Sequence, residues 1–273
     1  MKRRALALLT LLALVGLAAA TLAPLLWMVS LSLMPAGEAT AVPARLLPSR
    51  PTLEHYAALF SRLPLARAFA NSLLLASAAT ALGLVSNSLA GYAFAKLRFR
   101  GRDTLSRALL AALVIPGQVA MLPLFLMVKE LGLVNTYAGV LVPSLASIFG
   151  IFLVRQYVVG IPDALLDAAR LDGAGELRVF TAVVLPLCRP VLVTLATFTF
   201  LGAWNDFLWP LVVLGDERLQ PLPVALASLL GEHAQDVELL MAGSLLTVLP
   251  VVVLFVALQR YYLQGILTGG LRG

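Results

Sequence analysis

The residues of this chain best suited to chemistry or binding gather in one polar stretch, IPDALLDAARLDGAGELRVFTAVVLPLCRP, which covers residues 161–190. Its pattern is helical, and Asp167 supplies a carboxylate beside two of the smallest side chains, those of Ala168 and Ala169. Minimal side chains let a helix approach a partner surface closely, and Gly173 lets the chain turn away afterwards. The stretch therefore suits non-covalent docking of a partner.

Other chemistries lack the residues that they need. No phosphate loop of the form G-x-x-x-x-G-K-[ST] occurs, so if ATP drives this protein, another chain must hydrolyse it. His55 and His233 fall in different loops, where we expect both to be solvated, and neither H-E-x-x-H nor G-x-S-x-G is present. A single cysteine, Cys188, allows no intrachain disulfide and no cysteine-based metal site. We expect no catalytic residue, no metal and no cofactor, and Cys188 is expected to be a buried apolar filler.

The elements that must position the polar stretch are membrane helices. Of 273 residues, 60% are hydrophobic and 12% are charged, which indicates a membrane protein. Five runs without Asp, Glu, Lys or Arg reach the roughly 20 residues that cross a bilayer. They are Ala5–Met34, Ala68–Ala95, Ala108–Val128, Leu131–Val154 and Leu239–Gln259. A sixth candidate follows Arg189 and runs to Gly215, so the sequence predicts an all-α polytopic membrane protein with about six spans.

Asp206 is the one charged residue of the sixth candidate span. An ionisable residue in a span is a candidate for a transport function, but the neighbouring tryptophans also fit an outer aromatic belt. Two interpretations stay open: Asp206 is satisfied near the interface, or it lines a translocation path. Asn205, Asn87 and Asn71 are further polar candidates for such a path.

The basic residues indicate how the chain crosses the membrane. With the N-terminus inside, fourteen of the twenty Lys and Arg residues fall in inner segments, which favours both termini in the cytoplasm and an even number of spans. The first run resembles a cleavable secretory signal, but it continues to Met34, well beyond a signal core of about 7 to 15 residues. We expect it to be retained as a helix. The net charge of +6 comes mostly from basic residues that flank the spans on the inner side. No basic patch apart from these residues indicates a nucleic-acid partner.

One membrane domain is expected over residues 1–273, with a core at about 68–262. The last outer loop, 216–238, is acidic and polar and is expected to face solvent or a partner. The polar stretch 161–190 falls in the cytoplasm between the fourth and fifth spans. Pro162 is expected at the first position of a short helix, Gly173 at its end, and Pro186 and Pro190 are expected to interrupt the backbone before the membrane.

The segment DAARLDGAGELRVFTAVVLP, residues 167–186, resembles the signature loop of ABC importer permeases, E-A-A, three residues, G, nine residues, I-x-L-P. Asp167 stands where that family usually has Glu, and Val183 replaces Ile. The coupling residues that the resemblance implies are Asp167, Ala168, Ala169, Asp172, Gly173, Leu185 and Pro186.

Other stretches resemble the carbohydrate-importer subfamily, and most closely its smaller, maltose-type permease subunit. They are FANSLLLA in the second span, VIPGQVAMLPLFLMVKELGLVNTYAGVLVP across the third and into the fourth, WNDFLWPLVVL in the fifth in chain order, which is the candidate that follows Arg189, and LQRYYLQGILTGGLRG at the end. The resemblance covers most of the chain from about Trp27 onward.

This resemblance implies a multi-pass subunit of the bacterial inner membrane that imports sugars or oligosaccharides by alternating access. The partners that it implies are a second, different permease subunit, two ABC ATPase subunits and an extracytoplasmic substrate-binding protein. Glycerol phosphate or polyols remain alternative substrates, since importers of both resemble the subfamily. An autonomous secondary carrier or channel, and a membrane scaffold or sensor, remain alternatives from other classes.

Overall fold

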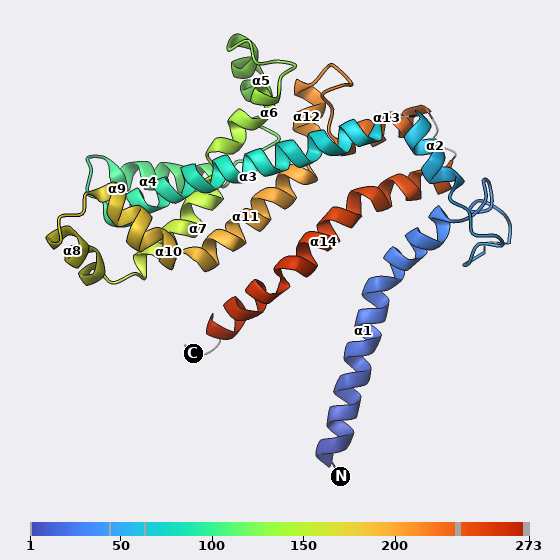
Figure 1. Ribbon diagram of the computed structural model, residues 1–273, viewed down its shortest axis with the longest axis horizontal. Helices are drawn as coiled ribbons and strands as arrows, with labels where there is room; N and C mark the ends of the chain where they lie inside the picture. Colours follow the sequence, from blue (N-terminus) through green and yellow to red (C-terminus); the bar gives the residue numbers. More distant parts are fainter. Residues whose placement is uncertain (1, 44, 63, 233–235, 270–273) are drawn as a thin grey trace. The chain divides into compact units, whose positions relative to one another are not determined.

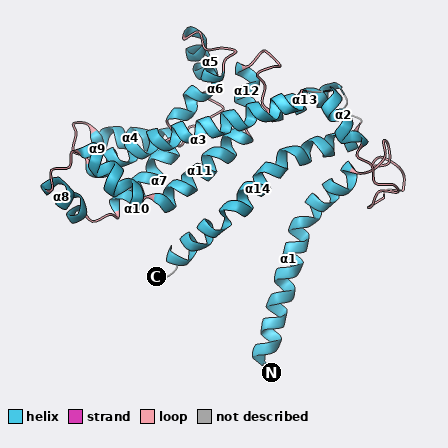
Figure 2. Cartoon of the chain, in the orientation of Figure 1, coloured by secondary structure: helices cyan, strands magenta, loops and turns pink. Residues whose placement is uncertain are grey.

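The computed structural model describes residues 2–43, 45–62, 64–232 and 236–269, and all regular structure in them is helical (Figure 2). This confirms the prediction of an all-α fold. The chain divides into two compact units. One comprises Met1–Ala66 with Ala225–Val253, and the other comprises Arg67–Val224 with Leu254–Gly273.

Figure 1 labels the helices in chain order. The first unit holds α1 (Lys2–Ser32) and α2 (Glu54–Arg62), together with most of α13 (Leu222–Glu232) and the beginning of α14 (Val237–Gly269). The second unit carries the polar stretch and most other helices. These are α3 (Leu65–Lys96), α4 (Arg102–Ala112), α5 (Met121–Glu130), α6 (Tyr137–Leu141), η1 (Val142–Leu145), α7 (Ile148–Val159), α8 (Asp163–Leu171), α9 (Glu176–Val179), η2 (Phe180–Val184), α10 (Leu185–Leu187), α11 (Arg189–Trp204) and α12 (Leu208–Val213).

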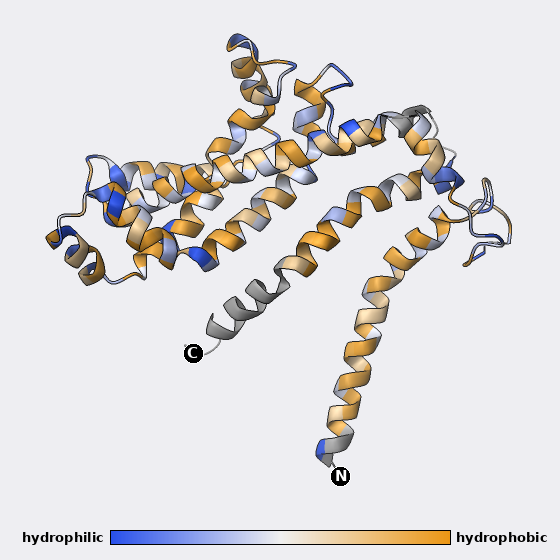
Figure 3. Ribbon diagram, viewed as in Figure 1, coloured by the Kyte–Doolittle hydropathy of each residue, from blue (hydrophilic) through white to orange (hydrophobic). Residues whose placement is uncertain are grey.

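Four helical segments in the described residues are long and apolar enough to cross a membrane: Leu6–Ser32, Leu65–Lys96, Tyr137–Val159 and Val237–Ala257. A fifth is possible if the bent pair Glu176–Leu187 and Arg189–Trp204 counts as one span. Their apolar side chains colour most of their length as hydrophobic in Figure 3. The described residues therefore hold four or five candidate spans, where the sequence predicts about six.

The third predicted span, residues 108–128, accounts for part of the difference. Its residues are divided between α4 and α5, and the intervening segment, 113–120, forms turns. Pro116 and Gly117 lie in these turns, where the missing amide hydrogen of proline and the freedom of glycine both disfavour helix. Charge-free length alone did not reveal this break.

The core beneath the polar stretch joins helices that are distant in sequence. Val154 and Val158 of α7, Leu166 of α8, Phe180 of η2 and Leu195 of α11 are buried in one cluster. Helix α7 packs against α11 along the same cluster. Burying an aliphatic or aromatic side chain contributes about 1.5–3 kcal/mol, so this cluster fixes the base on which α8 lies. Cys188 is also part of it, which confirms the expected buried cysteine.

The prediction that His55 is solvated is wrong. His55 is buried at 4% exposure, and its Nε2 lies 2.8 Å from the Met34 carbonyl oxygen, because α2 folds back on the end of α1. Residues 216–238 include helix α13, whose Leu222 and Val224 side chains are buried. The polar composition of that loop hid a short apolar helix. His233 lies outside the described residues.

Candidate functional site

Helix α8 presents small and apolar side chains to the outside while one leucine anchors it. Leu166 is 1% exposed and belongs to the core cluster, whereas Leu165 and Ala168 are exposed. Leu171, at the end of the helix, is 89% exposed. Asp163 lies in the first turn, where a carboxylate favours the positive end of the helix dipole. Pro162 precedes the helix as its N-cap, one position earlier than predicted.

Gly173 ends α8 in the left-handed conformation, with a φ of 83°. Its amide donates to the Arg170 carbonyl, and the Ala174 amide donates to the Ala169 carbonyl, both at 3.0 Å. This pair of bonds is a Schellman motif, in which glycine is favoured because other residues are strained there. The predicted end of this short helix at Gly173 is confirmed, and the physical reason is the left-handed backbone conformation of that glycine.

The conformation predicts how substitutions at Gly173 should behave. A Cβ placed there would meet nothing within 4 Å, so the cost is backbone strain of about 1–2 kcal/mol for Gly173→Val. Asparagine tolerates the left-handed region, so Gly173→Asn should cost less. We expect amide hydrogen exchange at residues 173 and 174 to be about tenfold faster in Gly173→Val and nearly unchanged in Gly173→Asn. Equal exchange in both variants would contradict the proposed role of the left-handed turn.

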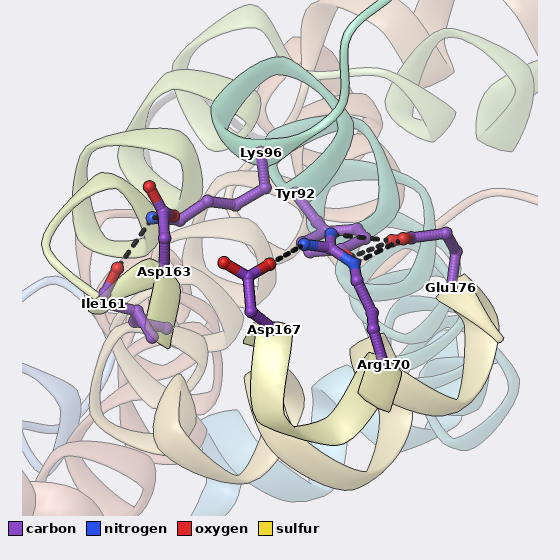
Figure 4. A network of polar contacts seen from close by, with 7 residues as sticks. All are labelled: Tyr92, Lys96, Ile161, Asp163, Asp167, Arg170 and Glu176. Carbon is purple, nitrogen blue, oxygen red and sulfur yellow. Dashed lines mark hydrogen bonds and ion pairs between the residues drawn. The ribbon is translucent and has the colours of Figure 1, made fainter. Parts of the chain in front are cut away.

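A chain of polar contacts ties the end of α8 to helix α3 (Figure 4). The Arg170 guanidinium donates to Asp167 Oδ1 through Nη1 and to Glu176 Oε1 through Nε, each at 2.8 Å. The Tyr92 hydroxyl, on α3, donates to Glu176 Oε2 at 2.5 Å. Hydrogen bonds from Arg170 to Glu176 and Asp167 raise the pKa of Arg170, which stays charged at any physiological pH. Glu176 is thus held from two sides.

The beginning of the same segment is tied to α3 by a lysine. Lys96 Nζ donates to the Ile161 carbonyl and to Asp163 Oδ1, each at 2.6 Å (Figure 4). The Lys96 side chain is 9% exposed although Asp163 is 76% exposed. Hydrogen bonding to Lys96 lowers the pKa of Asp163 below its usual value. Because Tyr92 and Lys96 are four residues apart, one face of α3 holds both ends of α8.

The segment after α8 is a continuous but irregular helix. From Glu176 to Leu187 the chain passes through α9, the π-helical η2 and α10, and it then bends by 82° into α11. Pro186 lies inside this helix, directly after the wider π turns, so the prediction that Pro186 interrupts the backbone is wrong. The break comes at Cys188, just before Pro190 in the first turn of α11. Leu185, a predicted coupling residue, packs against the core cluster.

Asp206 lines a cavity of about 210 Å³ in the second unit. The other polar residues on its wall are Ser144 and Thr199, which the sequence did not single out. Asp206 Oδ1 accepts a long hydrogen bond, 3.4 Å, from the Trp209 amide. Asn205 follows α11 and is exposed, and its side-chain amide donates to the Leu201 carbonyl.

The two remaining candidates are engaged in tertiary structure. Asn71 donates to the Arg218 and Gln220 carbonyls at 2.9 and 3.0 Å, and its Oδ1 accepts from Tyr137. Asn87 is fully buried, and its Oδ1 accepts from the Ser147 amide at 2.9 Å. Neither is among the residues that line the Asp206 cavity. Their part in a substrate path stays a prediction.

Four residues of the α8 contacts were missed by the sequence: Tyr92, Lys96, Arg170 and Glu176. Two signals could have indicated them. Lys96 directly follows a charge-free run, and Tyr92 precedes it by one helical turn. Arg170 lies three residues after Asp167 on the same helix, where oppositely charged side chains meet.

These features define the class as a polytopic helical membrane protein with a short, partly exposed helix, α8, in its second unit. A family model described as "Binding-protein-dependent transport system inner membrane component" matches residues 79–267. The chain belongs to this family, and it is therefore a permease subunit of a binding-protein-dependent ABC importer. Subunits of this family lack ATPase activity of their own, and they are multi-pass proteins of the inner membrane.

Curated relatives and solved structures agree with this family. The chain is 40% identical over 227 residues to the arabinooligosaccharides transport system permease protein AraQ of Halalkalibacterium halodurans, covering 83% of this chain and 81% of the relative. It is 32% identical to the melibiose/raffinose/stachyose import permease protein MelC of Bacillus subtilis, covering 84% of each. A crystal structure of a bacterial ABC transporter involved in the import of the acidic polysaccharide alginate contains a similar chain. That match has a TM-score of 0.82 and 25% identity, and it covers 96% of this chain and 98% of the other.

Proposed function

We propose that this permease imports an oligosaccharide or a related sugar, with energy that a separate ATPase supplies through α8. The observation that carries this proposal is the surface of α8, where Leu165, Ala168 and Leu171 are exposed, in a chain that has no phosphate loop. The buried Leu166 holds the helix on the core cluster, and the small and apolar side chains on its exposed side form a surface that can fit into a cleft of another protein.

The proposed assembly contains a second, different permease subunit, two ABC ATPases and an extracytoplasmic substrate-binding protein. Closure of the ATPases on ATP pushes α8, and α3 receives the movement through Tyr92 and Lys96. Asp167, Ala168, Asp172 and Gly173 form or shape the docking surface. Ala169 packs against the core cluster beneath α8, and Leu185 and Pro186 belong to the arm behind the helix. The asymmetry of basic residues supports both termini in the cytoplasm, with α8 on the same side.

Sugar is the proposed substrate class because the two curated relatives described above are named for arabinooligosaccharides and for melibiose, raffinose and stachyose. Glycerol phosphate and polyols are the alternatives within the same class of importer. An autonomous carrier would need a coupling site of its own, and Asp206 is the single acidic residue on the wall of its cavity in the described part of the chain.

Uptake into proteoliposomes that contain this chain, the second permease and the ATPases tests the proposal. With the binding protein and a radiolabelled oligosaccharide outside and ATP inside, we expect accumulation against a gradient. Omission of ATP, of the ATPases or of the binding protein should abolish it. Uptake by this chain alone, without ATP, would contradict the proposal and favour a secondary carrier or channel.

A further inference from the structure

The cavity beside Asp206 lies where two helices of the second unit are interrupted. Helix α11 ends at Trp204 and α12 begins at Leu208, so Asp206 lies in non-helical backbone. On the facing side, α6 gives way to the short 3-10 helix η1, which carries Ser144 and ends before an extended residue, Ala146. Both interrupted segments contribute residues to the cavity wall.

Interrupted helices inside a membrane protein have a physical meaning. The bilayer core supplies no water to satisfy free amides and carbonyls, so non-helical backbone is tolerated where it is buried in protein or lines an aqueous cavity. Transporters use such discontinuous helices to build substrate sites near the middle of the membrane. The position of the cavity at two interruptions therefore points to a site for a solute.

The chemistry of the wall is that of a hydrogen-bond acceptor. Asp206 is half-buried, and its carboxylate can accept several hydrogen bonds but receives one long bond from the described residues, from the Trp209 amide. Ser144 donates its hydroxyl to the Leu141 carbonyl, which leaves the oxygen as an acceptor. Thr199 adds a further hydroxyl to the wall. Sugar hydroxyls are the donors that such a set would bind.

The rest of the wall is small and apolar, with Ala79, Gly202 and Ala203 among its members. Such surfaces suit the carbon faces of a sugar ring. The described residues that line the cavity include no Lys, Arg or His. A phosphate or carboxylate placed there would meet the Asp206 carboxylate at low dielectric without a compensating cation, which strongly disfavours an anionic solute.

We propose that this cavity is a subsite for one unit of an uncharged, hydroxyl-rich solute, with Asp206 as the acceptor for its hydroxyls and as the group that excludes anions. The proposal rests on the proposed function and narrows its substrate class. It separates neutral sugars from glycerol phosphate, which the sequence alone left as an alternative.

Uptake by the assembled importer with its binding protein tests this subsite. The probes are neutral raffinose, maltose and arabinotriose, and anionic sn-glycerol 3-phosphate. We expect ATP-driven uptake of at least one neutral sugar and none of the anion. Asp206→Asn should lower the efficiency of neutral sugar uptake by about tenfold, since hydrogen bonds to a charged acceptor are worth more than those to a neutral amide. Thr199→Val should lower it by a smaller factor.

The matched control is Asp103→Asn, which removes an exposed carboxylate outside the cavity. Amounts of assembled complex and basal ATPase activity establish that each variant is folded. Unchanged sugar uptake in Asp206→Asn, uptake of the anion by the wild type, or uptake of none of the neutral probes would overturn the subsite. ATP-driven uptake of sn-glycerol 3-phosphate would overturn it while leaving the proposed ATP-driven import intact, so the two failures are distinguishable.

Discussion

Ala168→Trp is expected to abolish ATP-driven uptake while leaving the chain folded and inserted. Ala168 is exposed on α8, so the indole has room in this chain and would obstruct only a surface that approaches α8 from outside. A partner surface that contacts the small Ala168 side chain closely leaves no room for an indole. Loss of docking should reduce uptake at least a hundredfold, which corresponds to about 2.7 kcal/mol of free energy. Proteoliposome uptake and the amount of ATPase recovered with the complex measure the effect.

A tryptophan at another exposed alanine provides the control. Ala182 lies in the helical arm behind α8 and is also exposed, so Ala182→Trp adds the same bulk off the docking helix. We expect that variant to retain the ATPase and most of its uptake. Normal uptake in Ala168→Trp, or equal loss in both variants, would be incompatible with docking through α8.

Lys96→Met is the second substitution with a large expected effect, and it should uncouple hydrolysis from transport. Methionine keeps the length and apolar body of the side chain but removes the donor to the Ile161 carbonyl and Asp163. Helix α8 keeps its outer surface, so the ATPases should still bind and hydrolyse ATP, while α3 no longer follows the start of α8. We expect about tenfold less solute moved per ATP, the size associated with losing hydrogen bonds to a charged group.

Arg100→Met is the matched control for Lys96→Met. Arg100 is basic, exposed and four residues away, and its side chain makes no hydrogen bond or ion pair with the described residues. The ratio of solute moved to ATP hydrolysed, measured in the same proteoliposomes, should fall only in Lys96→Met. An unaltered ratio in Lys96→Met would show that α3 does not receive the movement through this lysine.

The sequence predicted most of what composition and local backbone chemistry determine. Charge-free length located the spans that became α1, α3 and α14. Gly173 ends α8 as predicted, because a left-handed helix end favours glycine and can be recognised from the local sequence alone. Family membership was also correctly indicated by the spacing within residues 167–186.

Features that depend on tertiary contacts were harder to predict. The ties from Tyr92 to Glu176 and from Lys96 to Asp163 join residues 84 and 67 positions apart, which no local pattern connects. Pro186 was expected to break the helix. It lies instead directly after π-helical turns, whose wider hydrogen-bonding pattern lets the helix continue although proline has no amide hydrogen to donate. The sequence predicts a solvated His55 because nothing in the loop around it indicates that α2 packs against the end of α1.

Cross-linking from α8 to the ATPase tests the docking of α8 most directly. Ala168→Cys places a thiol on the exposed surface of α8, and the native Cys188 is 2% exposed and shielded from reagent. With a maleimide-benzophenone attached to the introduced thiol and irradiated in membranes that contain the assembled importer, we expect Ala168→Cys to cross-link to the ATPase subunit and Ala182→Cys not to, because the excited benzophenone inserts into C–H bonds of any residue that lies close to it. Absence of the ATPase from the cross-linked product of Ala168→Cys, with the complex intact, would contradict docking through α8.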